Sequence, residues 1–97
     1  MKLKIAVAGF RHGHIYDIIA RAKNHPETAI VACCEEDEKT RMFIEQQGIA
    51  KITHTDCMKM IEDVDCDIIA IGDCYGKRGK IAIESLKKGR HILADKP

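Results

Sequence analysis

Three groups of residues in this 97-residue chain have the types and spacing of a ligand site. One group is Asp95-Lys96-Pro97, which directly follows an apolar run that predicts a buried strand. In open α/β sheets, ligands bind beyond the carboxyl ends of the strands. A lysine at that place can donate to a hydroxyl or carbonyl oxygen and stabilise the charge that develops there. These three residues are therefore candidates for contacts with a bound ligand.

The second group is a glycine-containing turn, Gly9-Phe10-Arg11-His12-Gly13. Dinucleotide-binding sheets carry G-x-G-x-x-G after their first strand, so that the backbone approaches the diphosphate and the N–H groups at a helix start bind it. This chain has G-x-x-x-G, in which Arg11 or His12 adds positive charge. We expect these five residues to bind a diphosphate, and an ordinary tight turn is the alternative. His12 and His14 have no third metal ligand at recognisable spacing, so no metal site is predicted.

The third group begins with Glu35, which ends the second apolar run and opens an acidic stretch. A carboxylate about twenty residues after the glycine turn can accept hydrogen bonds from the adenosine ribose hydroxyls. It would repel the 2′-phosphate of NADP by about 1 kcal/mol at 4 Å in water, or about 4 kcal/mol at an effective dielectric of 20. The sequence therefore favours NAD over NADP, unless Lys39 and Arg41 fold over the site.

Alternating strand and helix patterns must position these groups. Short apolar runs typical of strands occupy residues 3–8, 29–34, 49–53, 67–72 and 92–94. Helical spacing separates most of them, as in Ile15, Ile18, Ile19 and Ala22. Such alternation predicts an α/β fold with a parallel sheet, because right-handed crossovers place helices on both faces. We expect one Rossmann-like doubly wound domain over residues 1–97, with five strands in the order 3-2-1-4-5.

Charge and cysteine content exclude several classes of protein. Sixteen Lys plus Arg against fifteen Asp plus Glu give a net charge of +1, which provides no general attraction to nucleic acid or to a membrane surface. No apolar stretch approaches the length of a membrane span or of a signal sequence. The odd number of cysteines, without a C-x-x-C pair, predicts small reduced core residues and a cytoplasmic protein.

A resemblance to a known family covers essentially the whole chain and is most specific in its terminal part. Two segments resemble the glucose-fructose oxidoreductase and inositol dehydrogenase (Gfo/Idh/MocA) family, namely Asp67-Ile68-Ile69-Ala70-Ile71 and Ile81-Ala82-Ile83-Glu84-Ser85-Leu86-Lys87-Lys88-Gly89-Arg90-His91-Ile92-Leu93-Ala94-Asp95-Lys96-Pro97. The hallmark of that family is a helix ending in A-L-x-x-G-K-H-V-L, followed by E-K-P. The resemblance implies a dinucleotide-binding domain, then a substrate domain, and hydride transfer between NAD(P) and a sugar, a cyclic polyol or a related carbonyl compound.

The same resemblance implies roles and partners. It places Lys96 and Pro97 beside the nicotinamide and the substrate, which makes Lys96 the candidate catalytic residue. The substrate domain would follow residue 97, so we expect the 97-residue piece to bind cofactor without turnover and the full-length protein to form a homo-oligomer acting on a sugar-like molecule.

One segment departs from the family pattern. Relatives commonly read T-P-N-x-x-H after the fourth strand, where this chain has Asp73-Cys74-Tyr75-Gly76-Lys77-Arg78. Asp73 is a further cofactor-binding candidate, because it follows a strand at the same edge of the predicted sheet. A non-catalytic dinucleotide-sensing module is the alternative function. A flavodoxin-like or receiver-type module is disfavoured, because it would need an acidic cluster after the first strand.

Overall fold

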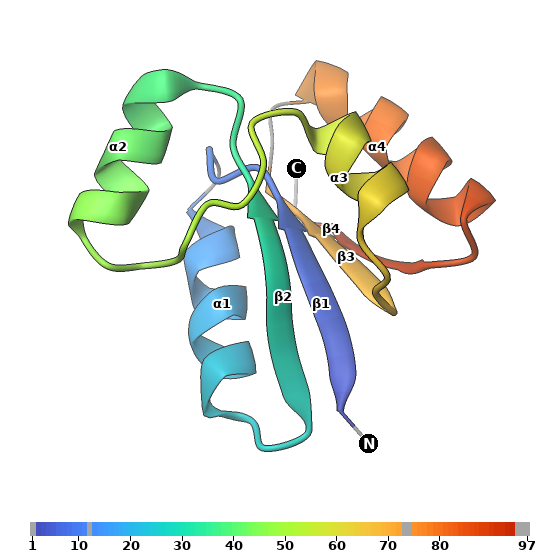
Figure 1. The fold of residues 1–97 in the computed structure, drawn as a ribbon, viewed down its shortest axis with the longest axis horizontal. Helices are drawn as coiled ribbons and strands as arrows, with labels where there is room; N and C mark the ends of the chain where they lie inside the picture. The colour runs from blue at the N-terminus through green and yellow to red at the C-terminus, as the bar shows by residue number, and fades with distance from the viewer. Residues whose placement is uncertain (1, 12, 73–74, 95–97) are drawn as a thin grey trace.

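Four parallel strands form one sheet in a computed structural model that describes residues 2–11, 13–72 and 75–94. The strands are β1 (Leu3–Ala8), β2 (Thr28–Cys34), β3 (Ile68–Ile71) and β4 (His91–Ala94), in the order β2-β1-β3-β4. The helices are α1 (His14–Asn24), α2 (Glu38–Gln46), α3 (Cys57–Asp63) and α4 (Tyr75–Lys87). Figure 1 shows the strand arrows running toward one edge, with α1 on one side of the sheet and α3 and α4 on the other. The predicted parallel α/β fold is confirmed.

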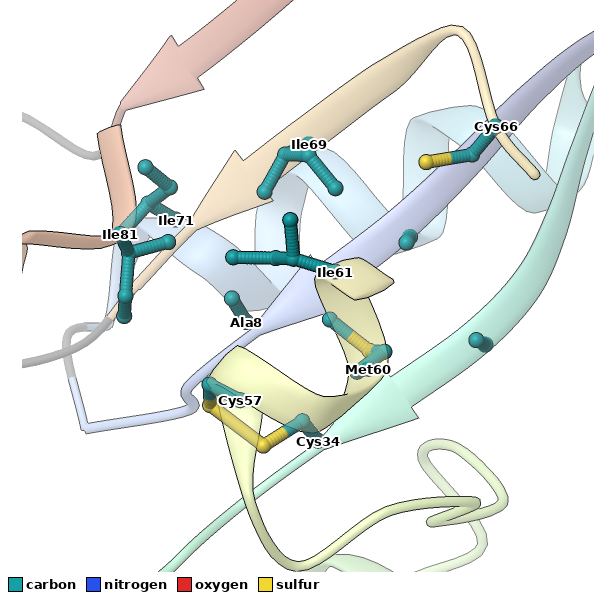
Figure 2. Close-up of a cluster of buried hydrophobic side chains, with 11 residues drawn as sticks. Ala8, Cys34, Cys57, Met60, Ile61, Cys66, Ile69, Ile71 and Ile81 are labelled. Carbon is teal, nitrogen blue, oxygen red and sulfur yellow. A yellow bond between two sulfur atoms is a disulfide. The ribbon is translucent and has the colours of Figure 1, made fainter. Parts of the chain in front are cut away.

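Side chains of β1 alternate between two hydrophobic cores, one on each face of the sheet. Ile5 and Val7 point to the face covered by α1, and Ala6 and Ala8 to the face covered by α3 and α4. We call these the α1-face core and the α3/α4-face core. The α1-face core also contains Phe10, Ile15, Ile19, Ala22, Cys33, Ile44 and Ala70. The α3/α4-face core, shown in Figure 2, also contains Ala32, Cys34, Cys57, Met60, Ile61, Cys66, Ile69, Ile71 and Ile81.

The predicted third strand, residues 49–53, is wrong, and so is the five-strand count. Ile49 and Ile52 pack against the α1-face core, so the segment buries its apolar side chains without joining the sheet. Only its end reaches β2, where the Thr53 N–H donates to the Cys33 carbonyl at 2.8 Å and His54 forms an isolated bridge with Cys34. The other four strands keep the predicted order.

Two aspartates determine where α2 and α3 begin, beside the carboxyl edge of the sheet. The Asp37 carboxylate accepts hydrogen bonds from the backbone N–H and the hydroxyl of Thr40, at 3.0 and 2.7 Å. These bonds hold the pKa of Asp37 below its ordinary value. The Asp56 carboxylate caps α3 by accepting from the N–H groups of Met58 and Lys59. Such caps satisfy N–H groups that have no partner inside the helix.

The expectation that all cysteines are reduced is wrong for one pair. Cys34, at the end of β2, and Cys57, the first residue of α3, form a disulfide with 5.5 Å between their Cα atoms. The fold brings together two residues that stand 23 positions apart in the chain, which no spacing rule reveals. Cys33 and Cys66 are buried free thiols. None of the helices in the described ranges combines the length and apolarity needed to cross a membrane.

Candidate functional site

The glycine turn lies at the point where the strand order of the sheet reverses. The strand β1 is central, with β2 on one side and β3 on the other, and ligands of open α/β sheets bind in the crevice at such a switch point. Gly9 has φ of +91°, a conformation that side-chain-bearing residues rarely adopt. A Cβ on Gly72, just after β3, would stand 2.7 Å from the Gly9 carbonyl oxygen. Two glycines therefore let the turns after β1 and β3 meet closely.

Glu35 fastens the glycine turn to the end of β2. Its side chain is fully buried, and Oε1 accepts a hydrogen bond from the Phe10 N–H at 2.8 Å. The other oxygen, Oε2, accepts from the Asp37 N–H at 2.8 Å and from Arg11 Nε at 3.4 Å. A buried carboxylate needs such donors, because an unpaired buried charge is strongly unfavourable. Contact with ribose stays a prediction for Glu35, and the structure shows it supporting the turn.

Phe10 positions the turn mainly through its backbone. Its ring is 1% exposed and lies in the α1-face core. Its N–H is bonded to Glu35, and its carbonyl accepts from the Tyr16 hydroxyl at 2.9 Å. Burial, and then the negative charge of Glu35, raises the pKa of Tyr16 and keeps that hydroxyl protonated as a donor.

Open space lies at Gly13, the residue that precedes α1. A Cβ added to Gly13 would meet nothing within 4 Å, and α1 has no side-chain cap. The first N–H groups of a helix have no partner within the helix, and they carry a partial positive charge. Before the helix, the Phe10 N–H is bonded to Glu35 and the Arg11 N–H to the Gly72 carbonyl at 2.9 Å. The start of α1 is therefore the candidate position for an anion.

A hollow of about 350 Å³ adjoins this turn, and two of the side chains that line it are cationic. It is lined by Phe10, Arg11, Tyr16, Lys39, Thr40 and Phe43. Arg41, which the sequence allowed over the site, instead donates from Nη1 to the Glu35 and Glu36 carbonyls at 3.0 and 2.9 Å. A larger hollow of about 560 Å³ follows the outer edge of β2, away from the glycine turn. We take the smaller hollow as the candidate site, because it lies at the carboxyl edge beside Gly9.

Several predicted residues cannot be placed. His12, Asp73, Lys96 and Pro97 lie outside the described residues. The structure brings together Gly9, Phe10, Arg11, Gly13 and Glu35, which is the diphosphate and ribose part of the predicted site.

Sequence reasoning missed a cluster on the other face. Ligand atoms of Cys34, Glu36 and Cys57 lie within 4.8 Å of one another, and the Cys57 N–H donates to Glu36 Oε2 at 3.1 Å. Since the two sulfurs are bonded to each other, they are not metal ligands in this state. The only sequence signal was a cysteine at a strand end followed by a second cysteine just after a helix cap.

Comparison with known proteins shows where this fold recurs. No protein-family model matches the sequence, and no curated protein matches it by sequence. Among solved structures, the WlbA dehydrogenase from Bordetella pertussis, in complex with NADH and UDP-GlcNAcA, matches the whole chain with a TM-score of 0.82 and 19% identity. An oxidoreductase from Agrobacterium radiobacter in complex with NAD+, L-tartaric acid and magnesium matches with a TM-score of 0.84 and 18% identity. The myo-inositol 2-dehydrogenase from Lactobacillus plantarum matches with a TM-score of 0.77 and 21% identity.

The chain corresponds to less than a third of each of these three proteins. This chain spans 30%, 28% and 29% of those three proteins respectively. Inositol dehydrogenases are among the structural neighbours, as the sequence resemblance predicts. The chain therefore has the Rossmann-like fold found in part of these dehydrogenases.

Proposed function

We propose that this chain binds NAD at the carboxyl edge of its sheet, as the cofactor-binding part of an oxidoreductase. The observation that carries the proposal is the geometry of the first turn. Gly9 bends the backbone at the switch point, the buried Glu35 carboxylate holds the Phe10 N–H, and the start of α1 lies open at Gly13. This arrangement suits a diphosphate. Structural neighbours solved with NADH and with NAD+ support the choice of ligand.

Different described residues would bind different parts of the dinucleotide. The diphosphate would meet the first N–H groups of α1, and the adenosine ribose would enter the hollow lined by Arg11, Lys39 and Thr40. Thr40 also has its hydroxyl and N–H bonded to Asp37, which fixes the start of α2 beside that hollow. The two cationic side chains that line this hollow, Arg11 and Lys39, would each attract the adjoining diphosphate by about 1 kcal/mol at 4 Å in water.

The choice between NAD and NADP depends on which charge faces the ribose. Glu35 was expected to repel a 2′-phosphate, yet its carboxylate is buried beneath the turn and paired with Arg11. Arg11 and Lys39 line the hollow above it. We propose NAD because neighbours contain it, and NADP is the alternative that these two cations favour.

We also propose the reaction class and the partners of the full-length protein. Bound NAD would supply a hydride acceptor, and a sugar, cyclic polyol or related carbonyl compound would be the substrate. Lys96 would donate to the reacting oxygen and stabilise its charge, since an ammonium group can do both. The substrate would be held by a second domain, in a homo-oligomer. A dinucleotide-sensing module without turnover remains the competing proposal, and a hydride-transfer assay of the full-length protein with polyols separates the two.

Calorimetric titration with NAD, NADH and NADP tests the binding proposal. Lys39→Ala should weaken NADH binding about fivefold, the equivalent of about 1 kcal/mol. Lys51→Ala is the matched control, because Lys51 lines the hollow at the β2 edge instead. Absence of binding by every dinucleotide would refute the proposal, and so would an equal loss in both variants. Tighter binding of NADP than of NAD would reverse the cofactor preference.

A further inference from the structure

The disulfide between Cys34 and Cys57 lies at the junction of β2 and α3. It joins the end of β2 to the first residue of α3 and closes the carboxyl end of the α3/α4-face core (Figure 2). Both residues are buried, at 0% and 1% exposure. The Cys57 N–H also donates to Glu36 Oε2 at 3.1 Å, across the same junction. This hydrogen bond would keep the two sulfurs close if the bond between them were reduced.

The end of β2 supports the first turn through two consecutive residues. The Cys34 carbonyl accepts a hydrogen bond from the Gly9 N–H at 2.9 Å. The next residue, Glu35, accepts from the Phe10 N–H at 2.8 Å. A covalent bond at Cys34 therefore restrains a residue whose backbone directly holds the proposed dinucleotide turn.

A small hollow adjoins Cys57. It has a volume of about 170 Å³ and is lined by Glu36, Cys57, Met58, Lys80 and Ile81. It carries one cationic side chain, Lys80, and one carboxylate, Glu36, whose oxygen lies within 4.8 Å of both sulfurs. The other two described cysteines are free thiols, and burial raises the pKa of Cys66 and raises that of Cys33 to about 11. Because Cys34 and Cys57 are the described pair already joined by a disulfide, thiol exchange is expected there.

We propose that Cys34 and Cys57 are a reversible thiol modification site, which exchanges with low-molecular-weight disulfides and in its oxidised state restrains the dinucleotide turn. The effect on the cofactor rests on the function proposed above. In the oxidation, the Cys57 thiolate attacks the small disulfide, a mixed disulfide forms and one small thiolate leaves. The Cys34 thiolate then attacks Cys57 Sγ, the protein disulfide forms and the second small thiolate leaves. The protein loses two electrons, and its two protons end on the two released thiols.

Thiol labelling tests the modification itself. The protein is equilibrated with mixtures of reduced and oxidised glutathione, quenched with acid, unfolded in denaturant, labelled with a maleimide and mapped by peptide mass. Cys34 and Cys57 should lose the label together as the oxidised fraction rises, in the wild type and in the Cys66→Ala control. The proposal is overturned if either residue stays labelled, or stays protected, at every ratio.

Two further measurements test the coupling to the first turn. In the reduced protein, amide hydrogen exchange at Gly9 and Phe10 should be about fivefold faster or more, and NADH should bind about fivefold more weakly or more, at the low end of common coupling effects. The double variant Cys34→Ala, Cys57→Ala should not respond to glutathione. Equal exchange rates in both redox states would overturn the coupling. If NADH binds neither state, the proposed function fails, while labelling and amide exchange still decide this inference.

Discussion

The two faces of the sheet are closed in different ways. The α1-face core surrounds Phe10 of the first turn, whose backbone is held by hydrogen bonds to the side chains of Glu35 and Tyr16. The α3/α4-face core is closed at the same edge by the Cys34–Cys57 disulfide. Neighbouring residues Cys33 and Cys34 belong to opposite cores, because successive side chains of a strand alternate. The first face shapes the proposed ligand turn, and the second restrains the strand end that supports it.

The largest expected effect comes from a substitution that removes the support of the turn on the first face. Glu35→Ala leaves the buried Phe10 N–H and the Asp37 N–H without their acceptor. Each unsatisfied buried donor costs about 1 to 3 kcal/mol, so we expect the free energy of unfolding to fall by about 3 kcal/mol or more. Urea denaturation measures this change.

Glu38 provides the control for that variant. It is an exposed residue in the first turn of α2, and Glu38→Ala should change the free energy of unfolding by only about 0.5 kcal/mol. Similar losses in the two variants would contradict the supporting role of Glu35.

Gly72 tests how closely the turns after β1 and β3 approach at the switch point. In Gly72→Ala the new Cβ would stand 2.7 Å from both the Gly9 carbonyl oxygen and the Ile15 Cβ, so backbone must move. Overpacking of this kind should lower the free energy of unfolding by about 1 to 3 kcal/mol. Gly79→Ala in α4 meets no atom within 4 Å and should stabilise the protein by about 0.5 to 1 kcal/mol. Thermal melts of the pair should shift in opposite directions, and a shared direction would be evidence against the close approach.

The cap of α3 tests the second face without breaking the disulfide. Asp56→Ala removes the carboxylate that accepts from the Met58 and Lys59 N–H groups, and should lower the free energy of unfolding by about 1 kcal/mol. Asp65→Ala is the comparison, since Asp65 forms only an exposed ion pair with Lys4, worth under about 1 kcal/mol. Denaturant titration of both variants should rank Asp56 above Asp65, and the reverse order would contradict a stabilising cap.

A pH dependence should distinguish the two adjacent cysteines. Burial raises the pKa of Cys33 to about 11 from an ordinary value of 9.0. A raised pKa means that the folded state keeps its proton longer, so stability should decline as the pH rises from about 9 toward 11. Cys34 contributes no such slope while it is bonded to Cys57. Cys33→Ala should flatten the decline measured by urea denaturation, and an unchanged slope would assign it to other groups.

Much of the fold followed from patterns in the sequence. The runs that became β1, β2, β3 and β4 were recognisable because buried parallel strands are short, continuous and apolar. Residues 49–53 form a similar short apolar run, but Ile49 and Ile52 bury their side chains against the α1-face core. A local sequence pattern does not reveal against which part of the fold an apolar side chain packs.

The residues of the candidate site were predictable from the sequence, and their roles were less so. The position of Glu35 at a strand end indicated function, but its complete burial and its bonds to Phe10 and Arg11 arise only when the turn folds over it. The Cys34–Cys57 pair depends on where α3 docks, which is a tertiary fact. Sequence spacing records neither of these contacts.

The most direct test of the central claim is an NADH titration followed by backbone amide NMR of the protein. We predict the largest chemical-shift changes at residues 9–16 and at Lys39 and Thr40, which surround the glycine turn and its hollow. Shifts centred on the hollow at the outer edge of β2, or no saturable shifts at all, would contradict the claim that this turn binds the dinucleotide.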